Sequence, residues 1–378
     1  MKKVYFMAFA ATVAMAMTSC SSEDLTAGTG TSNNEATAIN FSTYLGRNVE
    51  SRAGETTKGG LTKIGVYAAY TGSENWASSK SLDFMMNQEV TKSGDSWSYT
   101  PLKYWPANAA EKISFFAYAP YGDGNNVTLT KNTTANSTTT APTGAPVATF
   151  TITDATIAQT PDFVAACVMN QAKPTDSKVQ FTLKHAMTRV AMQAKVNDEV
   201  YADGDAKKTK VVITSVKLTG DELTTNAKYT LPNSTDANGK WEATGETHAF
   251  GLSNVLKDDA SGITGNSDKG AVLTGTTAAS ILKDIDYLYL IPANAGTGLS
   301  VAGKVKAEIS YSIVTADDKL ANKSVTTTAT KTVDLPKDAL TQGKSYKFTF
   351  TIGVNAIVLD VQSVEEWGAD VTNTDINN

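Results

Sequence analysis

The segment KYWPANAAEKISFFAYAPY (103–121) contains two short apolar runs, each followed by a proline. Aromatic side chains bury large apolar areas, so such runs are typical of strands that fill a protein core. Pro106 and Pro120 end the runs because proline lacks the N–H that a strand ladder requires. The side chains predicted to supply this core are Tyr104, Trp105, Phe115, Phe116 and Tyr118.

Similar short runs continue along the chain, for example VQFTLKHAMTRVAMQAKV (179–196), separated by turn residues such as Gly, Asn and Asp. No helical period persists for three turns after residue 20. The sequence therefore predicts an all-β protein built from β-sandwiches. The polar stretch 126–146 is predicted to be a loop, because it consists almost entirely of Thr, Asn, Ala and Pro.

A chain of 378 residues is long for a single core, so two domains are expected. The polar stretch around Pro174 separates two strand-rich halves. We therefore predict an N-terminal β-sandwich at 53–178 and a C-terminal one at 179–378.

Composition excludes several classes of function. A net charge of −5 argues against nucleic acid as a partner. The two cysteines and two histidines lack the close spacing that a structural zinc site requires. No catalytic motif occurs, so we expect no enzyme activity, no cofactor and no metal site; calcium in the acidic loops stays open. Cys167 is predicted to be a small buried hydrophobic residue, and His185 a hydrogen-bonded core residue.

Residues 1–20 have the pattern of an export signal: Lys2 and Lys3, an apolar run (4–17) and the ending MTSC (17–20). This ending resembles a bacterial lipobox, in which Cys20 is acylated, for example with palmitate, and anchors the protein in the outer membrane. The alternative is an ordinary signal peptide that happens to contain a cysteine. Residues 21–37 are rich in Ser, Thr, Gly and Asn and are predicted to be a tether.

The stretch AINFSTYLGRNVESRAGETTKGG (38–60) joins an alternating strand to a polar segment. Ile39, Phe41 and Leu45 point to one face, which is typical of a half-buried strand. Arg47 and Arg52 follow in the glycine-punctuated part.

Together with SRAG (51–54) and the lipobox, the segments 103–121, 179–196 and 340–367 resemble the fimbrillin family of Bacteroidales in matching order. This resemblance implies two transthyretin-like β-sandwich domains in tandem. It also implies a structural subunit of a cell-surface fimbria, or pilus, exported as an outer-membrane lipoprotein. Its implied partners are other fimbrial subunits, an Arg-specific protease and a host or bacterial surface ligand for adhesion.

The resemblance also assigns residues. Within 21–52, the strand carrying Ile39, Phe41 and Leu45 would be a removable placeholder. The protease would cut after Arg52, or after Arg47 as the fallback. The alternative is that both arginines are ordinary charged loop residues with no proteolytic role. The cut would vacate a groove for a strand of the neighbouring subunit. The candidate donor strand carries Ile357, Leu359 and Val361, although this run could simply be the last strand of the second domain.

The alternative function is a monomeric surface lipoprotein that binds glycans. Trp76, Trp97 and Trp241 are predicted to lie in or beside loops, where they could stack on sugar rings.

Overall fold

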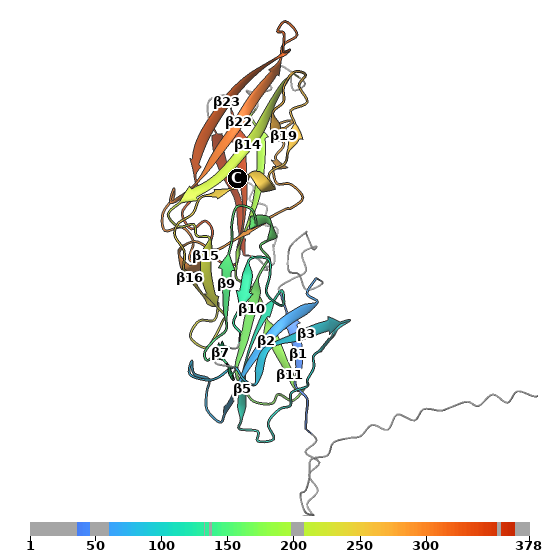
Figure 1. Cartoon of the computed structure of the whole chain (residues 1–378), viewed down its shortest axis with the longest axis vertical. Helices are drawn as coiled ribbons and strands as arrows, with labels where there is room; N and C mark the ends of the chain where they lie inside the picture. Colours follow the sequence, from blue (N-terminus) through green and yellow to red (C-terminus); the bar gives the residue numbers. More distant parts are fainter. Residues whose placement is uncertain are drawn as a thin grey trace, which may run out of the picture. The chain divides into compact units, whose positions relative to one another are not determined.

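Nearly all regular structure in the computed structural model is β-strand (Figure 1). The structure describes residues 36–45, 60–131, 133–135, 138–197, 208–353 and 357–366. The all-β fold class predicted from the sequence is confirmed. In this part of the chain, no helix has the length and apolar character needed to cross a bilayer. The described residues also include short 3₁₀ turns at Ile157–Gln159, Ser253–Val255 and Asn294–Gly296.

A six-stranded sheet, called here the central sheet, organises the first part of the chain. Its order is β12 (Lys184–His185), β10 (Val164–Gln171), β5 (Lys112–Ala119), β2 (Lys63–Gly72), β3 (Met85–Ser93) and β4 (Ser96–Ser98). A two-stranded sheet packs on one face, formed by β1 (Asn40–Tyr44) and β11 (Lys178–Thr182). The other face packs against β16 (Lys240–Ala243), β15 (Asn226–Thr230), β9 (Val147–Thr151) and β6 (Val127–Leu129).

Because successive strand residues point to opposite faces, the central sheet contributes to two cores. Phe115 of β5 packs with β1 and β11, whereas Phe116 and Tyr118 pack with the sheet that contains β15. Burial on both faces explains why β5 is a continuous apolar run rather than an alternating one. Trp105 is buried as predicted, but the prediction for Tyr104 is wrong, because alternation leaves its side chain 46% exposed.

Two further sheets pack face to face and share one core. The first contains β20 (Ala279–Ser280), β13 (Thr188–Val196), β24 (Lys344–Ile352) and β25 (Ile357–Glu366), and β21 (Leu288–Leu290) also pairs with β13. The second contains β18 (Asp259–Ala260), β19 (Lys269–Leu273), β14 (Thr209–Gly220), β22 (Val305–Ala316) and β23 (Ser324–Asp334), and β17 (Phe250–Gly251) also pairs with β14. Alternating residues such as Met192, Phe348, Ile213 and Ile309 fill the space between them.

Strand pairing crosses residue 178, where the sequence predicts a domain boundary. The polar stretch there forms a turn, in which Ser177 N–H donates to the Pro174 carbonyl at 3.0 Å. After this turn β11 pairs with β1, and β12 pairs with β10. The hairpin of β15 and β16 pairs with β9, so residues from both predicted domains share one sheet.

The prediction of a loop without strands at 126–146 is wrong. This stretch contains β6 as well as a small hairpin of β7 (Thr133–Ala135) and β8 (Thr138–Thr140). Val127 and Leu129 are buried, because these two apolar residues alternate along β6, which pairs with β9, and both point into the core. Two inward apolar side chains are enough to fix a strand that composition alone describes as polar.

Candidate functional site

Strand β1 lies in a groove of the folded protein, along β11. The two strands are parallel, and the register pairs Asn40 with Lys178, Phe41 with Val179 and Tyr44 with Thr182. Each strand alternates between inward and outward residues, so the parallel pair presents one apolar face to the central sheet. The predicted placeholder strand is therefore an integral part of the first core in this structure.

Hydrogen bonds hold β1 beyond the ladder at both ends. At the start, Ile39 N–H donates to the Lys103 carbonyl at 2.9 Å, and the Tyr99 hydroxyl donates to the Ile39 carbonyl at 3.0 Å. At the end, Leu183 N–H donates to the Tyr44 carbonyl at 2.8 Å. The segment 99–105 thus closes the groove at the N-terminal end of β1, and β11 supports its full length.

Apolar packing contributes strongly to the attachment of β1. Ile39, Phe41 and Leu45 are 1%, 4% and 6% exposed. Burial of these three side chains contributes about 5–9 kcal/mol gross, at about 1.5–3 kcal/mol each. The ring of Phe41 lies in an aromatic cage, with centroids 5.3 Å from Tyr99, 5.7 Å from Phe181 and 6.1 Å from Phe115. Removal of β1 would expose this cage to water.

Covalent attachment of β1 to the rest of the described fold runs through residues 46–59, which lead to β2. Arg47 and Arg52 lie in this linker, and both fall outside the described residues, as does Cys20. One cut in the linker separates β1 from every strand that follows. After such a cut only non-covalent contacts retain β1 in the groove.

Strand β25 contains the candidate donor residues. It pairs antiparallel with β24 at the edge of its sheet, with Leu359 opposite Phe350 and Val361 opposite Phe348. Ile357, Leu359 and Val361 are half-buried against the core, whereas Val358 is 61% exposed. This position within the same chain is the alternative that the sequence left open, and donation requires β25 to leave β24.

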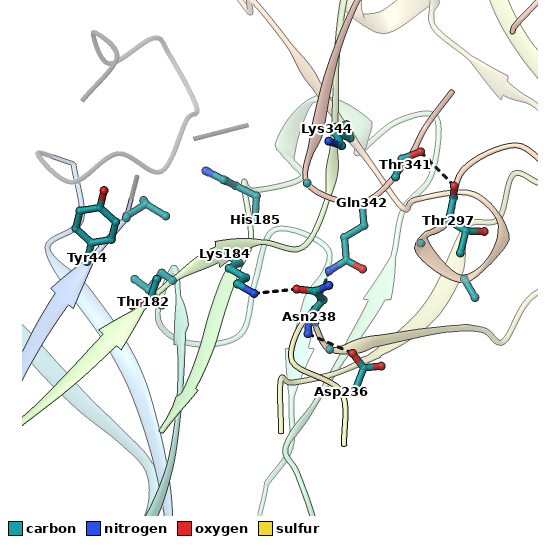
Figure 2. Close-up of a pocket in the computed structure, with 16 residues that line it drawn as sticks. Tyr44, Thr182, Lys184, His185, Asp236, Asn238, Thr297, Thr341, Gln342 and Lys344 are labelled. Atoms are coloured by element: carbon teal, nitrogen blue, oxygen red, sulfur yellow. Dashed lines mark hydrogen bonds between the residues drawn. The ribbon is translucent and has the colours of Figure 1, made fainter. Parts of the chain in front are cut away.

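A pocket of about 660 Å³ opens where β1 ends (Figure 2). Its walls come from the ends of β1 and β11, the β15–β16 turn, the 295–297 segment and the residues before β24. The Lys184 ammonium donates to Asn238 Oδ1 at 2.9 Å, and Gln342 Nε2 donates to the Asn238 carbonyl at 2.8 Å. Lys344 and Asp236 are further charged residues in the wall.

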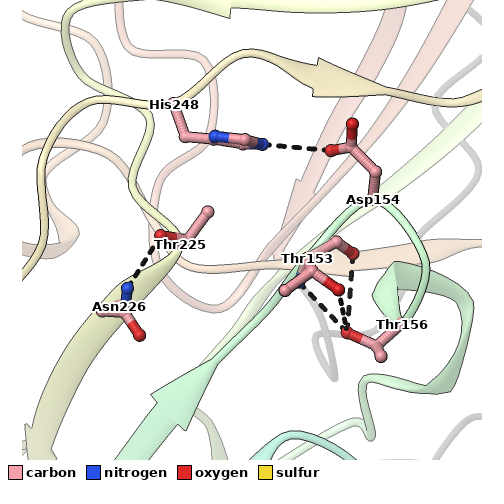
Figure 3. A network of polar contacts seen from close by, with 6 residues as sticks. All are labelled: Thr153, Asp154, Thr156, Thr225, Asn226 and His248. Atoms are coloured by element: carbon pink, nitrogen blue, oxygen red, sulfur yellow. Dashed lines mark hydrogen bonds and ion pairs between the residues drawn. The ribbon is translucent and has the colours of Figure 1, made fainter.

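Two histidine–carboxylate pairs join separate segments. Nδ1 of the buried His185 lies 2.8 Å from Oδ1 of the buried Asp162, at the start of β10. His248 Nε2 lies 3.1 Å from Asp154 Oδ1 in a partly exposed position between β9 and β17 (Figure 3). Each pair consists of one histidine and one carboxylate, and the described residues contain no group of three potential metal ligands. Both pairs hold neighbouring segments together.

Cys167 of β10 is half-buried beside the core, and burial raises the pKa of its thiol to about 11. Because only the thiolate is a strong nucleophile, Cys167 should be nearly inert at neutral pH.

In a Cys20→Ala variant, we expect alkylation of Cys167 at pH 8 to be about a hundredfold slower than that of an ordinary cysteine, as two pKa units imply. The rate should rise as pH approaches 11, as measured with iodoacetamide by mass spectrometry. A fast reaction at pH 7 would contradict this pKa.

The rings of the three tryptophans proposed for glycan stacking are partly or fully buried. Trp241 is only 1% exposed, and its indole N–H donates to the Ala186 carbonyl at 2.9 Å. Trp76 and Trp97 are partly buried and pack against the two cores. The prediction for Trp241 is wrong because its position after a turn suggested a loop, whereas β16 turns its ring into the core.

Comparisons with known proteins agree on one family. The sequence profile described as "Fimbrillin-like" matches residues 51–367. The chain is 32% identical to "Fimbrium subunit Fim1C" of Phocaeicola vulgatus over 373 residues, covering 92% of this chain and 95% of that protein. The crystal structure of a fimbrial protein from Bacteroides vulgatus superposes with a TM-score of 0.71 at 28% identity, covering 87% of this chain and 99% of that one. A profile match over most of the chain, together with a full-length relative, shows that this protein belongs to the fimbrillin-like family.

Proposed function

We propose that this protein is a structural subunit of a cell-surface fimbria that is activated by proteolysis and assembles by strand exchange. Membership of the fimbrillin-like family and similarity to a fimbrium subunit support a fimbrial role. The pathway begins with export as an outer-membrane lipoprotein acylated at Cys20. An Arg-specific protease then cuts after Arg52, or after Arg47, and β1 leaves its groove. The assembled fimbria mediates adhesion to a host or bacterial surface.

The observation that carries this proposal is the placement of β1. It contributes three buried apolar side chains to the first core, yet one linker with two arginines connects it to β2. An ordinary core strand does not need such an arrangement. A strand that must first complete the fold and later be removed does.

In this proposal the linker also keeps the uncut subunit monomeric. A tethered strand competes at an effective concentration in the millimolar range, which an incoming strand of similar sequence does not match. Cutting the linker removes this advantage, and diffusion of the released strand makes the exchange irreversible. The vacated groove then presents an unpaired edge of β11, which templates a strand of the neighbouring subunit.

The donor is the segment that forms β25, carrying Ile357, Leu359 and Val361. Its alternation matches that of Ile39 and Phe41 in β1, so both strands present apolar residues to one side. As an edge strand, β25 is hydrogen-bonded along one side only and can leave β24 without opening a sheet interior.

Treatment of the purified, full-length protein with an arginine-specific protease tests the proposal. We expect a new N-terminus at Ala53, or at Asn48 if Arg47 is used, and heat-labile ladders on a denaturing gel. The control is an inactivated protease. Cleavage within 46–59 that leaves β1 bound and the protein monomeric would contradict assembly through this groove.

A further inference from the structure

The pocket at the end of β1 is the strongest feature that the proposed function leaves unexplained. Its wall contains Tyr44 and Leu45, the last described residues of the β1 segment, and Thr182, which pairs with Tyr44. The groove that holds β1 therefore opens directly into the pocket. A strand that replaces β1 in the same parallel direction must send its following residues into this space.

The charged side chains of the pocket wall favour an acidic occupant. Lys184 contacts two neutral oxygens, Asn238 Oδ1 at 2.9 Å and the Ala237 carbonyl at 3.5 Å. Lys344 also lines the pocket, and Asp236 is bound by a local turn, since Asn238 N–H donates to its carboxylate at 3.2 Å (Figure 2). Among the residues that line the pocket, two lysines outnumber one carboxylate, in a chain whose net charge is −5.

The same pocket adjoins the end of the candidate donor strand. In the ladder of β24 and β25, Glu366 lies opposite Lys344 and Glu365 lies opposite Ser345. Lys344 is thus both the cross-strand neighbour of the acidic pair and a residue of the pocket wall. Opposite charges across a strand pair stabilise the pairing.

We infer that this pocket is an acidic-peptide site, which recognises Glu365 and Glu366 of a second copy of this chain during strand exchange. The inference rests on the proposed function. If Ile357 and Leu359 take the places of Ile39 and Phe41, Glu365 falls two residues beyond the place of Leu45. At about 3.3 Å per residue, this position lies about 7 Å past the place of Leu45. In the register that pairs Tyr44 with Thr182, it falls one residue beyond the level of Lys184.

Lys344 would then lie near acidic residues both before and after the strand exchange. Before exchange it lies opposite Glu366 of its own chain, and that neighbour is lost when β25 departs. The incoming strand brings the acidic pair of a second copy to the same wall. The exchange therefore favours a donor that carries acidic residues after its apolar run.

A fluorescent peptide with the sequence of residues 355–368, NAIVLDVQSVEEWG, provides the test with the full-length protein after arginine-protease treatment. The matched probe carries Glu365→Gln and Glu366→Gln. We expect the acidic peptide to bind about tenfold more tightly at low salt, and high salt should reduce the difference. In a Lys184→Gln protein the preference should be largely lost.

Lys178→Gln is the matched control, because Lys178 is an exposed lysine at the opposite end of β11. It should leave the preference for the acidic peptide unchanged. If that preference depended on Lys178 in place of Lys184, the inferred direction of the incoming strand and the inferred site would both be overturned. Equal binding of both peptides to the unmodified protein would overturn the inference but leave strand exchange intact. If neither peptide binds, the proposed donor segment would be overturned, and the inference with it.

Discussion

Replacement of Phe41 by alanine should strongly weaken the attachment of β1 to its groove without any proteolytic cut. The Phe41 ring is 4% exposed and contacts three other aromatic rings, so its truncation leaves a cavity in a closely packed core. Substitutions of this kind cost about 3–5 kcal/mol, a large part of the roughly 5–9 kcal/mol that the three apolar side chains of β1 contribute together. Hydrogen exchange of the β1 and β11 amides should accelerate by two orders of magnitude or more.

Tyr44→Ala is the matched control on the same strand. The Tyr44 side chain is 48% exposed and projects from the opposite face of β1, so its loss should change stability by less than about 1 kcal/mol. Urea unfolding of the uncut protein measures both variants. If Phe41→Ala were as stable as Tyr44→Ala, β1 would not be held by its apolar face, and the energetic basis of the exchange would fail.

Replacement of both Arg47 and Arg52 by alanine should abolish assembly while leaving the subunit folded. Both arginines precede β2 in the linker that follows β1, so the substitutions remove the proposed cut sites and leave the described core residues unchanged. The linker then keeps β1 at a millimolar effective concentration, which excludes the incoming strand. We expect only monomers after treatment with an arginine-specific protease, as assessed by gel ladders and electron microscopy.

Lys58→Ala is the control for charge in the same linker and should assemble normally. Single variants separate the two sites: loss of assembly in Arg52→Ala alone identifies Arg52 as the cut site, and loss in Arg47→Ala alone identifies Arg47. Normal fibres from the double variant would mean that assembly proceeds without removal of β1. That result would leave family membership intact and eliminate proteolytic activation at these arginines.

Local patterns predicted much of what the structure contains. The alternation of Ile39, Phe41 and Leu45 predicted a half-buried strand, and all three side chains are buried. The prediction of His185 as a hydrogen-bonded core residue agrees with its contact to Asp162. Such predictions succeed because the direction of a strand side chain depends on its neighbours in sequence, through the two-residue period of extended backbone.

Local patterns failed where the outcome depended on distant residues. Trp241 follows a turn and looked exposed, but β16 joins the sheet around β9 and turns the indole into the core. Val127 and Leu129 stand in a threonine-rich stretch, and only their burial in the core and the pairing with β9 make that stretch a strand. In both cases tertiary burial outweighed local composition.

The sequence by itself determined the all-β class, the apolar face of the first strand and the position of two arginines after it. Only the tertiary structure decided that this strand pairs in parallel with residues 178–182, that Phe181, Phe115 and Tyr99 surround Phe41, and that the groove ends in a pocket with Lys184 and Lys344. The physical reason is that alternation fixes which side of a strand is apolar, but the choice of its partner depends on the packing of segments far apart in the chain.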